Sequence, residues 1–565
     1  MAPAANMLAS GKREAVKLIE LAGTAESHRT KRLFEALSQA FPVRFQERGK
    51  GERNRTDAVI DFGTDATEAR DKVPTLRVSP AGKDSTKADK VLVQFTSSPS
   101  LPAVFRGRTV ETEAALPPSG LRLADQEVLA SISGRPIWAV RGQGAEESYH
   151  SAIPLPNMDA NGVLFEHFAS HNFLGLLPLI HFLHRVIGAD RWTAPPLRAC
   201  FMFDDPNLHW PRYGHVDFRE LALSAERHHY HASFATIPMD GWYVHRGTAE
   251  IFRQYQSRLS LLCHGNNHTT HELARDYAAA DRQALVAQAL QRIGSLERRS
   301  KVQVSRVMAA PHGACSEELM GDMARLGFEA ACISHWSNRS HNPSKQWNMR
   351  LGLAMAEMVA DLPLIPRFRI FPTCQTDILL AAFLNQPIIP VGHHEDVADG
   401  LALLEGLAGF INSLGEVQWL DMQSIARSNF FTLREAEVLQ VKMYSRKIRL
   451  AVPPGIEQLC IHRPWLSDGD QEGLELRLQN EDSVQFNLYR GERIPIRPGG
   501  EVEIASIHPS LLDSVKVPVA RTPLWAVARR QLCEIRDRMK PAARRLFKRG
   551  QRRAVSGKQP KNPPP

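Results

Sequence analysis

Residues 200–207 have the sequence Cys-Phe-Met-Phe-Asp-Asp-Pro-Asn, an apolar run that ends on two adjacent carboxylates. The run is aromatic and apolar and contains no Gly or Pro before its acidic end, so it predicts a buried strand. Neighbouring acids repel each other and lose hydration on burial, which indicates a cation or a proton beside one of them. The stretch therefore predicts a strand with a charged site at its end.

A second apolar run, Leu259–Cys263, ends in His264-Gly-Asn-Asn-His268. Two His residues four apart can turn both imidazoles toward one point. Together with Asp205 they form a three-ligand set that leaves one metal position open for water. Asp204 and Asp205 could instead form a turn or a helix N-cap, and the His residues could be ordinary loop residues. His271, three residues after His268, is a competing ligand.

Apolar runs and helical patterns alternate around these residues, which predicts parallel strands with helices outside and favours a (β/α) barrel of about seven strands. The predicted strands are Cys200–Phe203, His231–Ile237, Leu259–Cys263, Arg306–Ala309, Ala330–Ser334, Leu364–Phe371, Pro387–Val391 and Val417–Leu420. The polar residues follow these strands, as expected at the carboxyl-end mouth of such a barrel.

The whole chain is α/β, and its 565 residues are too many for one core. A densely apolar pattern over Leu164–Ile187 predicts a long helix that Pro178 kinks or divides. The expected organisation is a flexible leader (1–29), a small α/β accessory domain (30–152), a helical connector (153–194), the barrel (195–434), an all-β, sandwich-like domain (435–520) and a basic tail (521–565).

The basic balance of the chain lies in its tail. Residues 529–553 contain eleven Lys or Arg and two acidic residues, which accounts for the whole net charge of +9. Pro541 would break or kink a helix in this tail. The tail either docks on an anionic membrane surface or stays solvated; nucleic-acid binding is not expected, because no basic groove with interleaved aromatics is evident.

Seven scattered Cys residues without a Cys-x-x-Cys pair predict free thiols in a reducing compartment. No apolar run is long enough to span a membrane, and the N-terminus has no secretory core. The sequence therefore predicts a cytoplasmic protein, with a peripheral position at the inner membrane face as the alternative that the tail offers.

The motifs Asp204-Asp205 and His264-x-x-x-His268 resemble those of the polysaccharide deacetylases, the NodB-homology proteins of carbohydrate esterase family four. The resemblance covers about residues 195–430. It implies a NodB-like barrel in which Asp204 is the catalytic base, and in which Asp205, His264 and His268 bind a divalent metal, with zinc favoured.

Three later motifs extend this resemblance. Ala309-Ala-Pro-His-Gly313 is similar to Arg-x-Pro-x-Gly, which implies that Pro311, His312 and Gly313 line the substrate groove. Ala309 stands where the family has an arginine that orients the catalytic Asp. Trp336 would be a groove aromatic. His393 or His394 would be the catalytic acid, and the sequence does not distinguish them.

These residues favour a hydrolase that removes an N-acetyl group from an amino-sugar glycan or from its lipid-linked or nucleotide-linked precursor. The alternative is a non-catalytic carbohydrate-binding or glycan-assembly protein on a degenerate barrel, motivated by Ala309 and the flanking domains. A paired-carboxylate glycosidase is a third possibility, but no spacing supports a partner such as Glu395.

Overall fold

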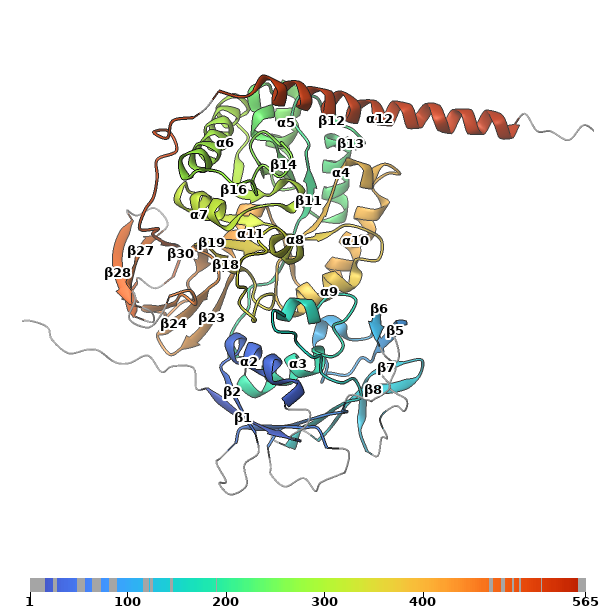
Figure 1. The fold of residues 1–565 in the computed structure, drawn as a ribbon, viewed down its shortest axis with the longest axis vertical. Helices are drawn as coiled ribbons and strands as arrows, with labels where there is room; N and C mark the ends of the chain where they lie inside the picture. Colours follow the sequence, from blue (N-terminus) through green and yellow to red (C-terminus); the bar gives the residue numbers. More distant parts are fainter. Residues whose placement is uncertain are drawn as a thin grey trace, which may run out of the picture.

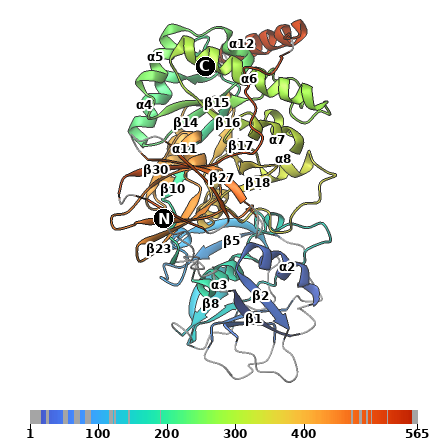
Figure 2. The same cartoon turned by 90° about the vertical axis from the view of Figure 1, so that its left-hand side faces the viewer.

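The computed structural model describes residues 16–23, 28–47, 56–63, 73–80, 89–114, 121, 125–142, 146–188, 191–466, 471–478, 483–489, 492–496, 499–519 and 521–556. A mixed N-terminal sheet forms one end of the molecule, and a parallel sheet flanked by helices forms the other (Figure 1). The C-terminal strands pack beside both (Figure 2), and a long helix crosses the end that carries the parallel sheet.

The N-terminal sheet has the order β2-β1-β3-β4-β9-β8-β7-β5-β6. Its strands are β1 (Lys17–Ala22), β2 (Val43–Glu47), β3 (Ala58–Asp61), β4 (Thr75–Val78), β5 (Asp89–Phe95), β6 (Thr109–Ala114), β7 (Glu127–Ile132), β8 (Arg135–Arg141) and β9 (Ser148–Ser151), and helix α2 is Lys31–Ala40. The prediction of a leader over residues 1–29 is wrong for Lys17–Ala22. This segment buries Ile19 and Leu21 and pairs in parallel with both β2 and β3, so it is an interior strand.

The connector does not form the long helix expected over Leu164–Ile187. A short 3₁₀ turn (Leu164–His167) is followed by irregular chain and then by α3 (Leu177–Ile187). Pro178 lies in the first turn of α3, where a missing N–H group breaks no helical hydrogen bond. Phe168 and Phe173 before it are buried without being helical, because the hydrophobic pattern reports burial and not helix alone.

The parallel sheet has the order β18-β19-β17-β16-β15-β14-β11-β21-β20, and only β18 runs antiparallel to its neighbour. Its strands are β11 (Phe201–Asp204), β14 (Ala232–Thr236), β15 (Leu259–His264), β16 (Val304–Ala309), β17 (Ala330–Cys332), β18 (Glu357–Val359), β19 (Leu362–Ile365), β20 (Phe368–Arg369) and β21 (Pro390–Gly392). A separate short pair joins β10 (Leu197–Ala199) to β22 (Val417–Trp419).

The single strand predicted over Leu364–Phe371 is instead two strands, β19 and β20, near opposite edges of the sheet. Pro366 has no N–H group for a sheet ladder and separates them. Since only residues 366–367 join these strands, the two edges lie within roughly 11 Å of each other. The sheet is therefore strongly curled, in agreement with the expected barrel class.

Because the sheet is curled, successive side chains along a strand alternate between its inside and its helix-covered outside. Cys200 and Met202 share a small apolar cluster with Ala235, Leu262 and Val307, which lines the inside of the curl. Phe201 and Phe203 belong to the main core that packs against the surrounding helices. These helices are α4 (Phe218–His228), α5 (Arg246–Gln254), α6 (Ala279–Ser300), α7 (Glu317–Arg325), α8 (His335–Ser340), α9 (Gln375–Phe383), α10 (Ala402–Asn412) and α11 (Met422–Arg427).

After α11 the chain forms two four-stranded sheets, in the orders β23-β24-β26-β29 and β25-β30-β27-β28. The strands are β23 (Phe430–Glu435), β24 (Val438–Met443), β25 (Lys447–Ala451), β26 (Gln458–His462), β27 (Gln471–Leu478), β28 (Val484–Tyr489), β29 (Arg493–Pro495) and β30 (Glu501–Ser506). Apolar residues of both sheets share one core. The all-β part therefore begins with β23, a few residues before the expected boundary.

The tail forms one helix, α12 (Leu524–Ser556), which continues through Pro541 without ending there. The helix runs along the carboxyl-end mouth of the parallel sheet and extends beyond the body of the molecule (Figure 1). Within the described part of the chain, no helix combines the length and apolar character that crossing a bilayer requires.

Buried ionic contacts hold the first half of α12 in place. Arg530 pairs with Asp240 at 2.7 Å, and both side chains are almost fully buried. His209 pairs with Glu534 at 3.0 Å. A buried pair is costly to break because it leaves an uncompensated charge, so these contacts fix both the position and the rotation of the helix.

We predict that the His209–Glu534 pair makes stability depend on pH. Burial lowers the pKa of His209, but Glu534 raises it above 6.5 overall; burial raises the pKa of Glu534, yet His209 and Arg538 bring it down to about 2. The His209 contribution is present below pH 6.5 and is lost as pH rises through the folded-state pKa; the Glu534 contribution is present above pH 4.5 and is lost toward about pH 2. In denaturant titrations, His209→Gln should cost about 1–3 kcal/mol between these limits and less above neutral pH.

Lys516→Gln is the control, because its pair with Asp513 is exposed and should contribute almost nothing. Parallel stability profiles of the parent and His209→Gln from acidic to alkaline pH would contradict the prediction.

Candidate metal and active site

Asp204 and Asp205 lie at the carboxyl end of β11, and the backbone directs them to different partners. Asp204 ends the strand with its carboxylate buried. Asp205 has φ = +83°, a conformation that non-glycine residues rarely adopt. The turn at Asp205 separates two carboxylates that would otherwise share one environment.

The two His residues lie on the loop that follows β15. Glu272 is buried beside this loop, and its Oε1 accepts hydrogen bonds from the backbone N–H groups of Asn266 (2.7 Å) and His268 (2.8 Å). Gly265 has φ = +62°, and a Cβ there would collide with Glu272 and Pro311. The carboxylate and the glycine thus set the turn that returns His268 toward His264.

Asp205, His264 and His268 converge. Their ligand atoms lie within 4.8 Å of one another, with Asp205 Oδ1 3.0 Å from His268 Nε2 and 3.6 Å from His264 Nε2. Asp205 Oδ1 is buried and has no hydrogen bond of acceptable geometry. Since 3.6 Å is too long for a hydrogen bond, this donor set fits a divalent cation.

The surroundings of the imidazoles support this fit. The Nδ1 of His264 lies 2.9 Å from the carbonyl oxygen of Ala309, which places the proton on Nδ1 and the lone pair on Nε2, toward Asp205. Burial lowers the pKa of His264 to about 4, so this imidazole is neutral at neutral pH. Burial alone would raise the pKa of Asp205, but His268, His264 and Arg530 hold it well below its usual range.

Asp204 has its own cation. Arg367 Nη1 lies 3.2 Å from both carboxylate oxygens of Asp204, and its Nη2 donates to the carbonyl of Ala310. Both side chains of the pair are buried. Arg367 therefore balances the charge of Asp204, the role that the resemblance assigns to the residue at the position of Ala309. That position supplies only its backbone carbonyl, to His264.

Of the residues predicted to line the groove, only some lie close to Asp205, His264 and His268. Pro311–Gly313 forms a 3₁₀ turn directly after β16, and the ring centroid of His312 lies 5.2 Å from that of His268. The N–H group of Gly313 already donates to Ala310. Trp336 is half exposed on α8, and its ring packs edge-on against Phe165, away from the described contacts of the ligands.

His393 and His394 follow β21 and differ in environment. His394 is buried, with its Nε2 near Glu395 (3.4 Å) and Asp537 (3.9 Å), whereas His393 is exposed. Both line a recess of about 280 Å³ together with Asp205. His393 is therefore the side chain with freer access to a bound molecule.

Helix α12 completes this recess with Arg536 and Asp537. It also holds the backbone of two predicted ligands: Arg529 donates to the carbonyl of His268 (2.6 Å), and Arg530 donates to that of Asp205 (3.1 Å). The sequence predicts a tail in solvent or on a membrane surface, whereas these contacts hold the first half of the tail against the parallel-sheet region. Asp537 also groups with His394 and Glu395 as a second set of ligand-type atoms.

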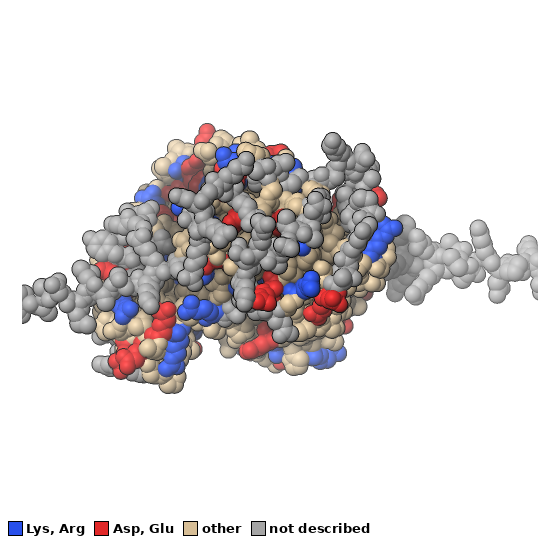
Figure 3. Space-filling model, turned by 90° about the horizontal axis from the view of Figure 1, so that it is seen from below, with Lys and Arg blue, Asp and Glu red and all other residues tan. Residues whose placement is uncertain are grey.

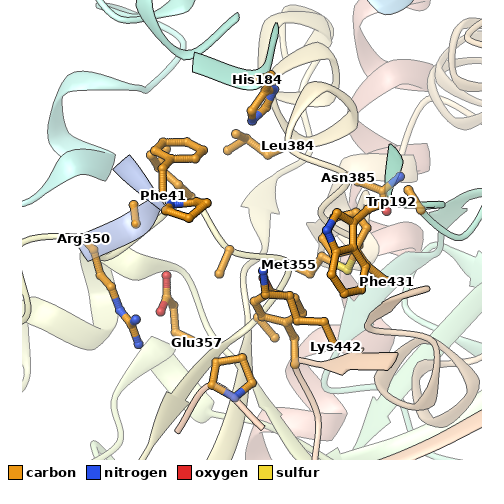
Figure 4. Close-up of a pocket in the computed structure, with 18 of the residues that line it drawn as sticks. Phe41, His184, Trp192, Arg350, Met355, Glu357, Leu384, Asn385, Phe431 and Lys442 are labelled. Atoms are coloured by element: carbon orange, nitrogen blue, oxygen red, sulfur yellow. The ribbon is translucent and has the colours of Figure 1, made fainter. Parts of the chain in front are cut away.

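A larger cavity, of about 730 Å³, lies away from these residues (Figure 4). Its walls come from the N-terminal part, the connector, the parallel-sheet region and the C-terminal strands, with Phe41, Trp192, Met355, Leu384 and Phe431 around it. This junction shares no lining residue with the recess at Asp205.

Several residues at the site were missed by sequence reasoning. Arg367 and Glu272 match no spacing rule, and Arg529 and Arg530 are 261 and 325 residues away from their partners. The only available signal was local: Arg367 directly follows a Pro within a predicted strand, a place where a break was to be expected.

We predict that the purified chain binds one divalent ion at Asp205, His264 and His268. Each of Asp205→Ala, His264→Ala and His268→Ala removes one of three ligands and should weaken binding by more than about 100-fold, as measured by metal analysis after chelation and reconstitution. His271→Ala is the matched control: its ring faces His312 and His341, outside the ligand group. Unchanged stoichiometry in the three variants would exclude this site.

The Arg367–Asp204 pair makes a second prediction. Arg367→Leu should destabilise the fold by roughly 3–5 kcal/mol, because Asp204 stays buried without its cation. Arg367→Leu combined with Asp204→Leu should cost less than Arg367→Leu alone, as a double-mutant cycle in denaturant would show. Arg212→Leu, which breaks the more exposed pair with Asp217, is the control and should cost about 0–1 kcal/mol. Additive losses would mean that Arg367 does not act through Asp204.

Comparisons with known proteins give a distant likeness only. No protein-family profile and no curated protein matches the chain. Among solved structures, a family 4 carbohydrate esterase from Streptomyces lividans in complex with acetate is 9% identical, with 39% of this chain and 88% of that chain covered and a TM-score of 0.23. A Streptococcus mutans CE4 esterase is 15% identical (40% and 86% covered, TM-score 0.23). A CE4-family pseudoenzyme from Bacillus anthracis is 11% identical (40% and 64% covered, TM-score 0.24).

Proposed function

We propose that this chain is a metal-dependent hydrolase that removes an N-acetyl group from an amino sugar. The observation that carries the proposal is that the two adjacent carboxylates, Asp204 and Asp205, have different partners. Asp205 shares a ligand set with His264 and His268, while Arg367 keeps Asp204 outside that set. A purely structural metal site is usually closed by a fourth protein ligand, whereas three ligands leave a position for water.

A divalent ion held by Asp205, His264 and His268, with zinc favoured by this donor set, would acidify a water molecule and polarise the acetyl carbonyl. Asp204 lies beside that set and is charge-balanced, so it can accept the proton of the attacking water. Arg367 fixes the orientation of Asp204 by contacting both of its oxygens. The site would thus hold its base in one geometry before substrate arrives.

The amine leaving group needs a proton, and we assign this role to His393. His393 is exposed in the recess that includes Asp205. His394 is less suitable, because both sides of its ring are occupied. Its Nε2 faces Asp537 and Glu395, and Gly214 packs so closely against its Nδ1 that a Cβ there would collide with it. We infer that His394 positions the loop and α12, whereas His393 transfers the proton.

The size of the recess favours a small substrate. A volume of about 280 Å³ lies at the lower end of small-molecule sites, and α12 forms one of its walls. We therefore favour a single N-acetylated sugar carried on a lipid or a nucleotide over a long polysaccharide. Pro311, His312, Gly313 and Trp336 remain proposed groove residues.

The decisive measurement is acetate release from a panel of N-acetylated sugars, including free oligosaccharides and nucleotide-linked and lipid-linked forms. Asp204→Asn should keep the metal and lower kcat by about 10²–10⁴-fold, because it removes only the base. His393→Ala should lower kcat more than His394→Ala does. The matched control is Asp217→Asn, a carboxylate whose described bonds are the α4 N-cap and Arg212.

The non-catalytic alternative predicts a different result. Stoichiometric metal with no acetate release from any member of the panel would favour a carbohydrate-binding protein. Equal activity of Asp204→Asn and the parent would remove the assigned base and with it the proposed mechanism.

A further inference from the structure

The first half of α12 has its polar and apolar faces reversed relative to an ordinary surface helix. Its buried positions are Ala526, Arg530, Glu534 and Asp537, three of them charged. The side chains that it turns to solvent include Leu524, Trp525, Leu532, Ile535 and Met539, which are 86, 56, 68, 54 and 62% exposed. A helix on a soluble protein normally buries its apolar stripe, so this arrangement indicates that another apolar phase covers the outer face.

The helix cannot simply rotate to hide the stripe. Arg530, Glu534 and Asp537 are engaged with Asp240, His209 and Tyr213 of the parallel-sheet region. Turning α12 would unpair these buried charges, which is strongly unfavourable. The outward stripe is therefore a fixed property of the fold.

Exposed aromatic residues gather around the same helix. Trp242 and Tyr243 are 60 and 41% exposed, and both rings pack on His209, the partner of Glu534. Trp210, 55% exposed, is the next residue after His209. Tyr and Trp are enriched where a protein meets the headgroup layer of a membrane, because their rings are apolar with one polar atom.

The helix that carries the stripe has an excess of positive charge in its second half. Arg536, Arg538 and Lys540 flank the stripe and pair with Asp537, Glu534 and Glu395. The sequence of α12 adds six further Lys or Arg after Pro541 and no acidic residue. At the opposite end of the molecule, visible acidic and basic side chains are interspersed (Figure 3). Two copies of α12 laid stripe to stripe would bring like charges together, so a second copy is a poor occupant.

We propose that α12 docks the protein on an anionic lipid surface, with the stripe of Leu524, Trp525, Leu532, Ile535 and Met539 inserted among the acyl chains. The Lys and Arg residues that follow Pro541 supply the charge that attracts the lipid phosphates, and Trp242 and Tyr243 rest in the headgroup layer. Because α12 is also a wall of the recess at Asp205, docking brings the candidate site to the membrane. A membrane-bound sugar carrier is then the fitting substrate, a consequence that rests on the proposed function, whereas the docking itself does not.

The test is cosedimentation of the full chain with vesicles of phosphatidylcholine alone or mixed with phosphatidylglycerol, at low and high salt. We expect binding to the anionic vesicles that weakens with salt, since exposed charges are screened. Leu532→Ser, Ile535→Ser and Met539→Ser combined should weaken it by at least about 100-fold, because each removes a large apolar side chain. Leu92→Ser, Leu223→Ser and Val484→Ser, at exposed apolar positions on other elements, form the matched control and should bind like the parent.

Tryptophan fluorescence provides a second measurement of docking if cosedimentation is weak. Trp525→Phe should remove part of the lipid-dependent blue shift in fluorescence, with circular dichroism showing an unchanged fold. Absence of binding to anionic vesicles by the folded parent overturns the proposal. A dimer that light scattering detects in the parent, and that the Leu532, Ile535 and Met539 variant loses, would identify a second copy as the occupant and would also overturn it. Acetate release is measured separately, in the absence of lipid. A failure of the proposed chemistry therefore leaves the vesicle-binding result unaffected.

Discussion

The site depends on burying two neighbouring carboxylates without letting them repel each other. Asp204 and Asp205 are adjacent in sequence, and each has a separate source of positive charge: Arg367 for the first, and for the second the ion that it would hold together with His264 and His268. The positive φ at Asp205 makes this separation possible. Separate partners matter because like charges in a shared dry site cannot both ionise.

The curl of the sheet supplies the arginine. Because β19 and β20 lie near opposite edges and only Pro366 and Arg367 connect them, Arg367 is held where the edges approach. From there it reaches Asp204 at the end of β11, the third strand from the β20 edge, and its second nitrogen donates to the carbonyl of Ala310 after β16. Ala309 belongs to the apolar cluster inside the curl. The arginine that β16 does carry, Arg306, pairs with Glu297 instead of Asp204. Charge balance at Asp204 is thus preserved although the residue at position 309 does not provide it.

Helix α12 links this chemistry to the outer surface. One face donates to the carbonyls of Asp205 and His268 and pairs with Asp240, so the helix supports the candidate ligands from behind. The other face is apolar and exposed. Both features arise because the charged residues Arg530, Glu534 and Asp537 of α12 face the protein. The position of the helix, the shape of the recess and the outer stripe therefore depend on one another.

Sequence alone was sufficient for the local features: a buried strand ending in Asp204 and Asp205, a His pair four apart, and alternating β and α elements that favour a curled parallel sheet. These follow from short-range rules of hydrophobic period and side-chain spacing, and in the structure Asp205, His264 and His268 lie close together. The sequence alone did not predict Arg367, Glu272 or the α12 contacts. Nor did it show that residues 17–22 form an interior strand and that Pro366 divides one predicted strand. Those outcomes depend on which distant segments meet, and long-range pairing leaves no periodic trace in the chain. Local spacing in the sequence was enough to identify the candidate ligands Asp205, His264 and His268. Only the tertiary structure decided which cation balances the neighbouring Asp204, because a buried ion is stabilised by whichever opposite charge the fold brings within reach.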